Sequence, residues 1–439
     1  MKKKTLLTAF LIVVAGLVLW GGQQLKHEKD ETIQDKENLT FMIATDIHFL
    51  APELHDDGQA FTFIKATAAG KDLDYQEQSL QAFIDQALVT KPDGLILTGD
   101  LTLNGEKISA EKMQELFRPL KKAGISLYCI PGNHDLYDGW ARSFKEKNQE
   151  KTPQISPENF KKIFPDGYEQ AISVAPDDLS YALAINPEYR FLLLDSNHYP
   201  MSESSAQPAT GGSIRDSTLE WLEKQLQSAK EQHQEPILFV HHNLLTHNKS
   251  VNQGYVLDNS PQVKKLLKDY GVSVVFSGHI HAQDIMAEDG LTEIVTSSYN
   301  IIDHGYGLLR LSKNQMSYSR KTISVSDWAQ KKKLTNTQLI NHDQYLKELF
   351  LKDGERLAYE TLLNQKITDE AQLKSAADFL AQVNLDYFQG NDWREDGSVT
   401  NLKQDPGYQL LTQTTFLKNY LTDILQDQNL NDQQWTLKK

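Results

Sequence analysis

Residues 125–135 read ISLYCIPGNHD: an apolar run stops at a proline and a glycine, and three polar side chains follow at once. A short run of aliphatic and aromatic residues that ends at a Pro-Gly pair is typical of a buried strand. Asn133, His134 and Asp135 therefore stand at the carboxyl end of that strand. The run also holds Cys129, the chain's single cysteine, so an internal disulfide and cysteine-rich metal sites are excluded.

Four other apolar runs also end in acidic or imidazole side chains. They are followed by Asp46-Ile47-His48 after residues 39–44, Gly99-Asp100 after residues 94–98, His241-His242 after residues 237–240, and Gly278-His279-Ile280-His281 after residues 272–276. One such group alone is more often a turn cap or a satisfied polar cluster. Five groups at five strand ends are poorly explained by chance, because strand carboxyl ends in α/β sheets share one edge. On an extended segment, Asp-x-His and His-x-His would each place two side chains on the same face.

Helical periodicity separates these strands. Apolar residues recur at helical spacing in residues 75–89, 110–123, 217–230 and 262–269, and further strand-like runs lie at residues 181–185, 190–194, 294–297, 307–311 and 316–319. Alternation of strands and helices predicts an α/β fold, and the number of strands predicts a doubled, mixed sheet.

The chain divides into four predicted parts. Residues 1–22 form a signal sequence or membrane anchor, 23–38 a polar linker, 39–323 the α/β domain and 324–439 a smaller helical domain. The last part is predicted because three amphipathic helical patterns replace the strands after residue 323.

The N-terminal segment differs from the rest of the sequence. Three lysines at positions 2–4 precede a 16-residue uncharged apolar run, residues 5–20, and no small-x-small cleavage pair follows it. We favour an uncleaved anchor over a cleaved signal. The expected location is outside the cytoplasm, anchored by this helix or secreted, on a bacterial cell surface. This segment would be the chain's contact with the membrane.

Composition excludes other classes. The chain has 439 residues with a formal net charge of −14, so a nucleic-acid duplex is not an expected partner. Its 39% hydrophobic and 24% charged residues describe an ordinary globular protein rather than a disordered one.

The five groups, in this order, resemble the signature of the calcineurin-like metallophosphoesterase superfamily over residues 39–323: D-x-H, G-D, G-N-H-[DE], a strand-end His, and G-H-x-H. The resemblance implies a four-layer αββα sandwich, here with an all-helical C-terminal domain, and two divalent or trivalent metal ions per chain. One metal would be held by Asp46, His48, Asp100 and His281, and the other by Asp100, Asn133, His241 and His279. His242 is the alternative to His241. Oxygen and imidazole ligands accept manganese, iron or zinc.

The activity that the resemblance implies is phosphoester hydrolysis by attack of a hydroxide that bridges the metals, with His134 as the catalytic residue at the leaving group. The phosphoprotein phosphatases of this superfamily read G-D-x-x-D-R-G, whereas residues 99–105 read GDLTLNG. The phosphate-clamping Arg is absent, and Leu103 replaces the Asp, so Asp135 becomes the candidate for orienting His134. The layout is most similar to bacterial exported cyclic-nucleotide phosphodiesterases with a helical C-terminal domain.

The expected substrate is therefore a small phosphodiester, a cyclic nucleotide or a related nucleotide. Two alternatives stay open: an exported phosphomonoesterase or nucleotidase, and a non-catalytic surface binding protein. Substrate-binding residues and the oligomeric state are not assigned. Two loop groups are weaker candidates for the pocket lining: His55-Asp56-Asp57 and Asn197-His198-Tyr199.

Overall fold

The computed structural model describes residues 30–392, 399–425, 428 and 430–439. Thr32–Lys439 forms one compact unit. The predicted anchor at residues 1–22 lies outside the described residues. Among the helices that are described, none has the length and apolar character needed to cross a membrane.

The first sheet has six strands in the order β15-β14-β13-β1-β2-β3. Their bounds are β1 Leu39–Ala44, β2 Gly94–Thr98, β3 Ser126–Ile130, β13 Gly305–Ser312, β14 Gln315–Thr322 and β15 Gln434–Lys438. Strands β1, β2 and β3 run parallel, and β13, β14 and β15 each pair antiparallel with their neighbours. In the register, Phe41 of β1 faces Leu309 of β13 on one side and Gly94 of β2 on the other.

The second sheet has seven strands in the order β11-β12-β10-β9-β8-β7-β6. Their bounds are β6 Ser173–Val174, β7 Tyr181–Asn186, β8 Tyr189–Leu194, β9 Glu235–Val240, β10 Val274–Ser277, β11 Asp284–Glu288 and β12 Leu291–Val295. The central strands β8, β9, β10 and β12 are parallel, and β6, β7 and β11 complete the sheet by antiparallel pairing. Both sheets are therefore mixed.

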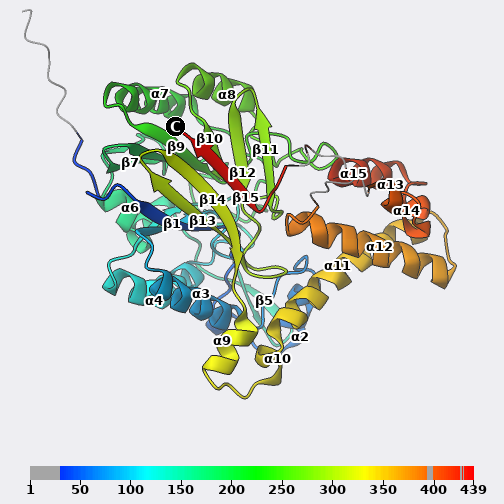
Figure 1. Ribbon diagram of the computed structural model, residues 1–439. Coiled ribbons are helices and arrows are strands. Elements are labelled where there is room, and N and C mark those ends of the chain that lie inside the picture. The colour runs from blue at the N-terminus through cyan, green and yellow to red at the C-terminus, as the bar shows by residue number, and fades with distance from the viewer. Residues whose placement is uncertain (1–29, 393–398, 426–427, 429) are drawn as a thin grey trace, which may run out of the picture. The chain divides into compact units, whose positions relative to one another are not determined.

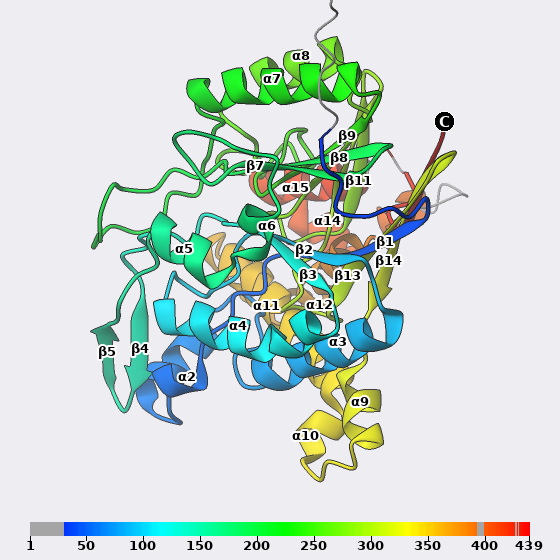
Figure 2. The same cartoon turned by 90° about the vertical axis from the view of Figure 1, so that its left-hand side faces the viewer.

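Four layers stack in the order helices, sheet, sheet, helices, as Figure 2 shows edge-on. Helices α3 (Gln76–Thr90) and α4 (Lys107–Lys122) cover the first sheet, and α7 (Asp216–Glu231) and α8 (Ser260–Asp269) cover the second. The inner strands are apolar on both faces, because each sheet is covered on both sides, whereas the edge strands β11 and β15 are partly exposed. This confirms the predicted αββα sandwich.

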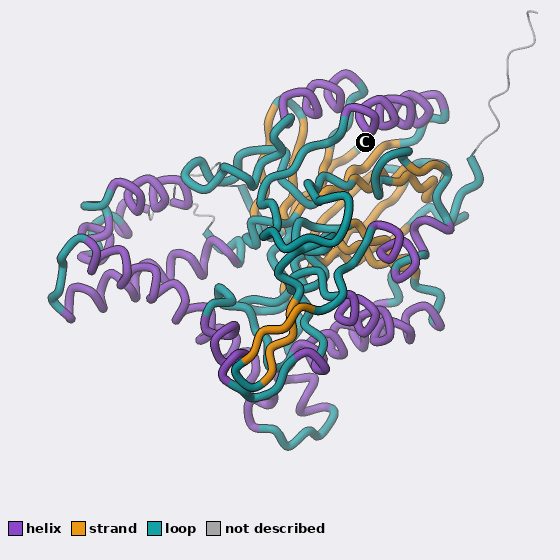
Figure 3. The backbone as a smooth tube through the Cα atoms, turned by 180° about the vertical axis from the view of Figure 1, so that it is seen from behind, coloured by secondary structure: helices purple, strands orange, loops and turns teal. Residues whose placement is uncertain are grey.

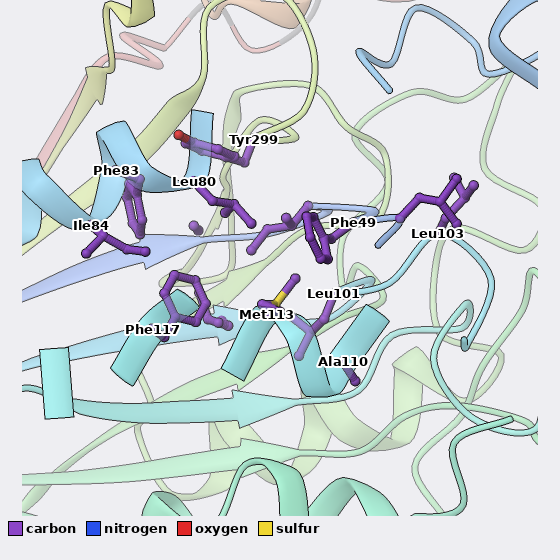
Figure 4. Close-up of a cluster of buried hydrophobic side chains, with 14 of the residues drawn as sticks. Phe49, Leu80, Phe83, Ile84, Leu101, Leu103, Ala110, Met113, Phe117 and Tyr299 are labelled. Atoms are coloured by element: carbon purple, nitrogen blue, oxygen red, sulfur yellow. The ribbon is translucent and has the colours of Figure 1, made fainter. Parts of the chain in front are cut away.

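Aromatic rings join the two sheets. The ring centroids of Phe41 and Phe191 lie 4.9 Å apart, and Phe239 stands 4.9 Å from Phe191 and 5.3 Å from Phe276. The outer core of the first sheet is built by α3 and α4, which place Phe83, Met113 and Phe117 against the sheet (Figure 4). These two cores hold the strand ends in fixed positions.

Short elements connect the layers: a 3-10 turn at Pro52–Leu54, α2 Gln59–Ala66, the hairpin of β4 Arg142–Lys145 and β5 Asn148–Lys151, α5 Pro157–Ile163 and α6 Asp166–Glu169. The hairpin is the isolated orange pair in Figure 3, apart from the two large sheets. Its main-chain bridge from Phe144 to His55 ties it to the loop after β1.

Helices gather beside the sheets after β14 (Figure 1). They are α9 Val325–Lys331, α10 Thr337–Ile340, α11 His342–Asn364, α12 Glu370–Phe388, α13 Val399–Leu402, α14 Pro406–Leu411 and α15 Thr415–Leu425. Helix α11 buries Leu346, Phe350, Gly354 and Ala358 at a spacing of four residues, one face of a helix. A side-chain carbon on Gly354 would lie 3.2 Å from the Cα of Ala381, so its lack of a side chain lets α11 approach α12 closely.

The end of the chain is not helical. After α15 the backbone returns to the first sheet, where β15 pairs with β14 and Trp435 faces Tyr318 across the ladder. Alternate residues Trp435 and Leu437 pack on the core between the sheets, while their neighbours are exposed. This period of two indicates a strand. In the sequence, the helical region therefore lies between β14 and β15, which are neighbouring strands of the first sheet.

Candidate metal centre

All five sequence groups lie at the carboxyl ends of strands β1, β2, β3, β9 and β10. Parallel strands within each sheet, and the packing of the two sheets against each other, bring these ends together. The result is one buried cluster of carboxylate, amide and imidazole groups.

Asp46, His48, Asp100 and His281 form the first half of the cluster, each offering one ligand atom within 4.8 Å of the others. The Nε2 atoms of His48 and His281 lie 3.2 Å apart. Oδ1 of Asp46 lies 3.3 Å from Nε2 of His281, and Oδ2 of Asp100 lies 3.6 Å from Nε2 of His48. The four side chains thus face one point.

Asp100, His241 and His279 form the second half, again with one ligand atom each within 4.8 Å of the others. Nε2 of His241 lies 3.5 Å from Oδ1 of Asp100 and 3.1 Å from Oδ1 of Asn133. Asp100 therefore presents one carboxylate oxygen to each half. The structure brings together all seven side chains that the sequence predicted as ligands.

Five residues of the cluster have a left-handed backbone conformation. Asp46, His48, Asp100, His279 and His281 have φ angles of +51°, +47°, +50°, +72° and +62°. The left-handed region is uncommon for residues with side chains and costs of order 1–3 kcal/mol each, and such residues concentrate at functional sites. The predicted extended Asp-x-His geometry is wrong: left-handed turns, rather than strand alternation, aim these side chains at one another.

Hydrogen bonds outside the cluster fix two of its imidazole rings. Nδ1 of His241 lies 2.9 Å from the carbonyl oxygen of Thr98, and Nε2 of His279 lies 3.0 Å from that of Gly254. A carbonyl oxygen only accepts, so each of these nitrogens carries the proton. In the neutral form of each ring, the opposite nitrogen is then a lone-pair donor, the arrangement typical of metal-binding histidines.

The charges of the cluster shift its pKa values strongly. Burial alone would raise the pKa of Asp100, but the facing His241 and His134 outweigh it and hold that pKa well below the ordinary value. Burial lowers the pKa of His48 well below its ordinary value. Burial and the neighbouring His241 lower the pKa of His279 to about 3. Burial alone would lower the pKa of His241, but Asp100 and Asp46 outweigh it and raise that pKa to about 9. Metal is bound by ionised carboxylates and neutral imidazoles, so a cation would replace the proton on His241.

The residues fit two hard or borderline cations. Oδ1 of Asp46 is buried and has no hydrogen-bond partner among the described residues, although it faces imidazole nitrogens. A buried carboxylate oxygen without a partner is costly, and a cation removes that cost. The donor set of carboxylate, amide oxygen and imidazole suits manganese, iron or zinc.

His134 lies at the edge of the cluster. Its main-chain N–H donates to Oδ1 of Asp100 at 2.9 Å, and its ring Nδ1 lies 3.2 Å from Oδ1 of Asn104 and 3.6 Å from Oδ2 of Asp138. Burial alone would lower its pKa, but the charges of Asp100 and Asp138 outweigh it and raise the pKa above its ordinary value.

Asp135 does not orient His134, contrary to the sequence-based expectation. Its carboxylate accepts hydrogen bonds from the main-chain N–H groups of Leu101, Thr102 and Gly132. It therefore ties the loop after β2 to the loop after β3. Asp138 and Asn104 take the orienting position instead, because the chain turns back toward His134 after residue 135.

The other candidates lie outside the cluster. Both ring nitrogens of His242 have partners, Oγ of Ser196 at 2.8 Å and the carbonyl oxygen of Thr210 at 3.0 Å, which favours His241 as the ligand. His55 stacks on Phe61. His198 is exposed and lies 2.8 Å from Oγ of Ser213.

The loop residues next to His55 and His198 form hydrogen bonds that support the surrounding loops. Asn197 donates to the carbonyl oxygen of Pro131 at 2.8 Å and so supports the loop that carries Asn133. The hydroxyl of Tyr199 donates to Asp195, and Asp56 accepts from the main chain of Gly58 and Glu146.

Sequence reasoning missed Lys71. This partly buried residue lies in the loop between α2 and α3, close enough to Asp100 and Asp46 to interact electrostatically with both. Burial lowers the pKa of its ammonium group, and the two carboxylates oppose that shift. No pattern around position 71 indicates this placement; only the fold shows it.

Two family models match the chain. Residues 39–283 match the calcineurin-like phosphoesterase model, and residues 324–431 match the model of the C-terminal domain of cyclic nucleotide phosphodiesterase. The first match covers every ligand of the cluster, and the second covers the helical region. Proteins of the family whose model matches residues 39–283 bind a dimetal centre, in agreement with the two halves of the cluster described above.

Curated relatives include phosphatases and a phosphodiesterase. The chain is 27% identical to the human serine/threonine-protein phosphatase CPPED1 over 258 residues, 54% of this chain and 71% of that protein. It is 30% identical over 155 residues to the probable glycerophosphodiester phosphodiesterase GpdQ of Arcobacter nitrofigilis, 35% of this chain and 43% of that protein. A dimetal phosphatase from Danio rerio shares the fold with a TM-score of 0.50 at 14% identity, over 65% of this chain and 96% of that one.

Proposed function

We propose that this chain, which belongs to the calcineurin-like phosphoesterase family, hydrolyses phosphodiester bonds in cyclic nucleotides or related nucleotides. The observation that carries the proposal is the convergence of seven ligand side chains around Asp100. The match of residues 324–431 to the C-terminal domain of cyclic nucleotide phosphodiesterase supports the diester and nucleotide part.

Asp46, His48, Asp100 and His281 would hold one metal ion, and Asp100, Asn133, His241 and His279 the other. A pair of ions held so would supply Lewis-acid activation of water and neutralise charge on the phosphoryl group. The chain's own part is to fix this cluster before substrate arrives. Thr98 and Gly254 set the imidazole rings, and Asp100 serves both halves.

His134 would deliver a proton to the leaving oxygen. A proton donor must be charged at the working pH and lie within reach of the reacting group. The carboxylates of Asp100 and Asp138 raise its pKa, and Asp138 and Asn104 both contact the same nitrogen, Nδ1. The other ring nitrogen, Nε2, is left for the substrate.

Phosphomonoester hydrolysis is the second candidate, because the matched human relative is named a serine/threonine-protein phosphatase. Against that assignment, residues 99–105 lack the Arg of the phosphoprotein phosphatase pattern. A non-catalytic binding protein is disfavoured because every ligand position is filled by a side chain that can bind metal.

The test uses the soluble chain from Leu39 onward, stripped of metal and reloaded with manganese, zinc or iron. It is assayed on matched chromogenic diester and monoester substrates beside Asn133→Ala, which removes one ligand. We expect metal-dependent diester turnover that Asn133→Ala loses. Dominant monoester turnover would establish the second candidate, and no turnover with bound metal would contradict both.

We also propose an extracytoplasmic location, on the basis of three lysines and a 16-residue apolar run in residues 2–20. Protease added to intact cells should cleave the full-length chain if it is displayed outside. Protection until the membrane is opened would contradict this location.

A further inference from the structure

A cavity of about 240 Å³ lies directly beside the metal cluster. His279 and His281 form part of one wall. The opposite wall comes from the helical region, through α11, α12 and α15. The helical region therefore reaches the reaction site and does not merely pack beside the sheets.

The cavity walls are mainly aromatic and aliphatic. Six of the lining residues are Tyr255, Ile280, Phe350, Leu357, Tyr387 and Tyr420. The ring of Tyr255 lies 4.9 Å from that of His279, so the aromatic surface begins next to a predicted ligand. Rings that line a cavity favour a flat apolar occupant, since stacking on an aromatic face is worth about 1–3 kcal/mol per base.

One buried polar group points to hydrogen bonding as well. Asn384 of α12 lines the cavity and is only 6% exposed. Its Oδ1 accepts a hydrogen bond from the hydroxyl of Tyr420 at 2.9 Å. Its amide N–H₂ group can donate to an acceptor on the occupant.

The cavity wall is tied to the cluster. The loop before Tyr255 bonds to the helical region, because the main-chain N–H of Ser250 donates to Oδ2 of Asp423 in α15 at 2.8 Å. The same loop continues to Gly254, whose carbonyl oxygen holds the ring of His279. The short segment from Ser250 to Gly254, with a hydrogen bond at each end, therefore fixes the distance between the cavity and His279.

We propose that this cavity, the ring pocket, binds a planar heteroaromatic ring of the substrate, the base of a nucleotide, while the phosphoryl group meets the metal cluster. The inference rests on the proposed function and names its substrate class. A cavity of about 240 Å³ has room for a ring system. A glycerol group would leave its aromatic walls uncovered.

The test measures binding, so that it does not depend on turnover. Calorimetry compares adenosine 5′-monophosphate with ribose 5-phosphate on the metal-loaded chain; C1′ carries adenine in the first ligand and a hydroxyl group in the second. Leu357→Trp fills the pocket from a position that is 38% exposed. Leu363→Trp is the matched control on the same helix, 49% exposed and not part of the pocket lining.

We expect the wild type and Leu363→Trp to bind the nucleotide at least about ten-fold more tightly than the sugar phosphate. Leu357→Trp should reduce that preference to about two-fold or less while leaving sugar-phosphate binding unchanged. Equal binding of the two ligands by the wild type, or an undiminished preference in Leu357→Trp, would overturn the ring pocket.

A turnover assay separates this inference from the proposed function. A cyclic nucleotide and a glycerophosphodiester are compared on the wild type and Tyr255→Ala. We expect Tyr255→Ala to raise KM for the cyclic nucleotide alone. If neither diester is hydrolysed but the ring preference in binding persists, the proposed function fails and the ring pocket stands. If both are hydrolysed equally well and Tyr255→Ala affects neither, the proposed function stands and the ring pocket fails.

Discussion

At the scale of single residues, Lys71 is a cation whose charge acts on the carboxylates of the cluster. It interacts electrostatically with Asp46 and Asp100, and also with Asp353, which lines the ring pocket. We expect a cation that interacts with both of these metal ligands to contact a phosphoryl oxygen of the bound substrate. Hydrogen bonds to charged groups are worth about 1.5–3 kcal/mol.

Lys71→Met should therefore lower kcat/KM by roughly ten-fold to a hundred-fold, because a charge-assisted contact to substrate is lost. Lys65→Met is the matched control, since Lys65 pairs with Asp74 at 2.8 Å near the surface. Steady-state kinetics on one diester decides. Equal kcat/KM values for both variants would contradict a substrate contact by Lys71.

His134→Ala separates proton donation from positioning. If His134 protonates the leaving oxygen, the variant should lose about 10²–10⁴-fold in kcat on esters of alkyl alcohols. It should lose far less on nitrophenyl esters, whose leaving group departs without a proton. The measurement is kcat across a series of leaving groups.

The control for this series is His198→Ala, which changes an exposed histidine outside the cluster. It should follow the wild-type dependence on the leaving group. An equal loss by His134→Ala on every ester would assign His134 a positioning role.

The segments that carry the seven candidate ligands could be predicted from sequence because each follows an apolar strand, and the resemblance to the superfamily signature implied which of their side chains are ligands. Asn104, Asp138 and Lys71 could not, because loops of irregular geometry carry them to the site. Asp135 misled for the same reason: its neighbours in sequence are not its neighbours in space. Strand ends therefore indicate which segments meet at the site, but they do not indicate which partners the polar side chains of those segments contact.

At the scale of elements, the loop after β3 must approach the loop after β2 very closely. A side-chain carbon on Gly132 would lie 2.2 Å from both the main-chain nitrogen and Oδ1 of Asp100. Gly132→Ala should therefore displace Asp100 and reduce bound metal, measured by elemental analysis. Gly211→Ala, whose nearest contact would be 3.6 Å, should keep metal and activity. Full metal content in Gly132→Ala would contradict the tight fit.

A buried charged histidine, His247, stabilises the second sheet through two carboxylates. Nδ1 of His247 lies 2.6 Å from Oδ2 of Asp284, and its Nε2 lies 3.2 Å from Oε2 of Glu293. Burial alone would lower the pKa of His247, but the charge and hydrogen bond of Asp284, together with the nearby Glu293, raise it to about 10. The ring is therefore charged in the folded protein at neutral pH.

A raised pKa sets the sign of a pH effect. The stabilisation from charged His247 is complete below its ordinary pKa of 6.5 and is lost as pH rises toward 10. His247→Gln should lower the free energy of unfolding by about 3–5 kcal/mol at pH 6, with a smaller difference at pH 10. Denaturant unfolding of both proteins at the two pH values measures this. A difference that grows with pH would refute the charged state.

Strands buried on both faces were predicted close to their observed bounds, because an apolar run of five or six residues is a strong local signal. The prediction of residues 94–98 coincides with β2. Strand β11, with the sequence DIMAE, was missed because it is a partly exposed edge strand with acidic ends. The polar β5 was missed for a similar reason, since all four of its residues are exposed.

At the scale of the whole molecule, the sequence pattern indicated an α/β domain and a helical region, and the family resemblance implied the sandwich. Neither indicated how the two parts connect. Strand β15 pairs with β14 across more than a hundred residues of chain. Such long-range pairing leaves no local signal. Its consequence is that both ends of the helical region are anchored to the first sheet, which holds the ring pocket against the cluster.

The candidate metal centre depends on long-range folding, because its ligands come from positions 46 to 281 and from both sheets. The central claim is that these side chains hold two ions that share Asp100. Counting bound metal by elemental analysis and titration calorimetry tests it without reference to any substrate.

We predict about two ions per chain for the wild type and for the control His198→Ala. His48→Ala and His279→Ala should each keep about one ion, because each removes a ligand from one half only. Asp100→Ala should keep none, because Asp100 faces both halves. A wild-type chain that binds a single ion, or a folded Asp100→Ala that still binds two, would contradict the shared site.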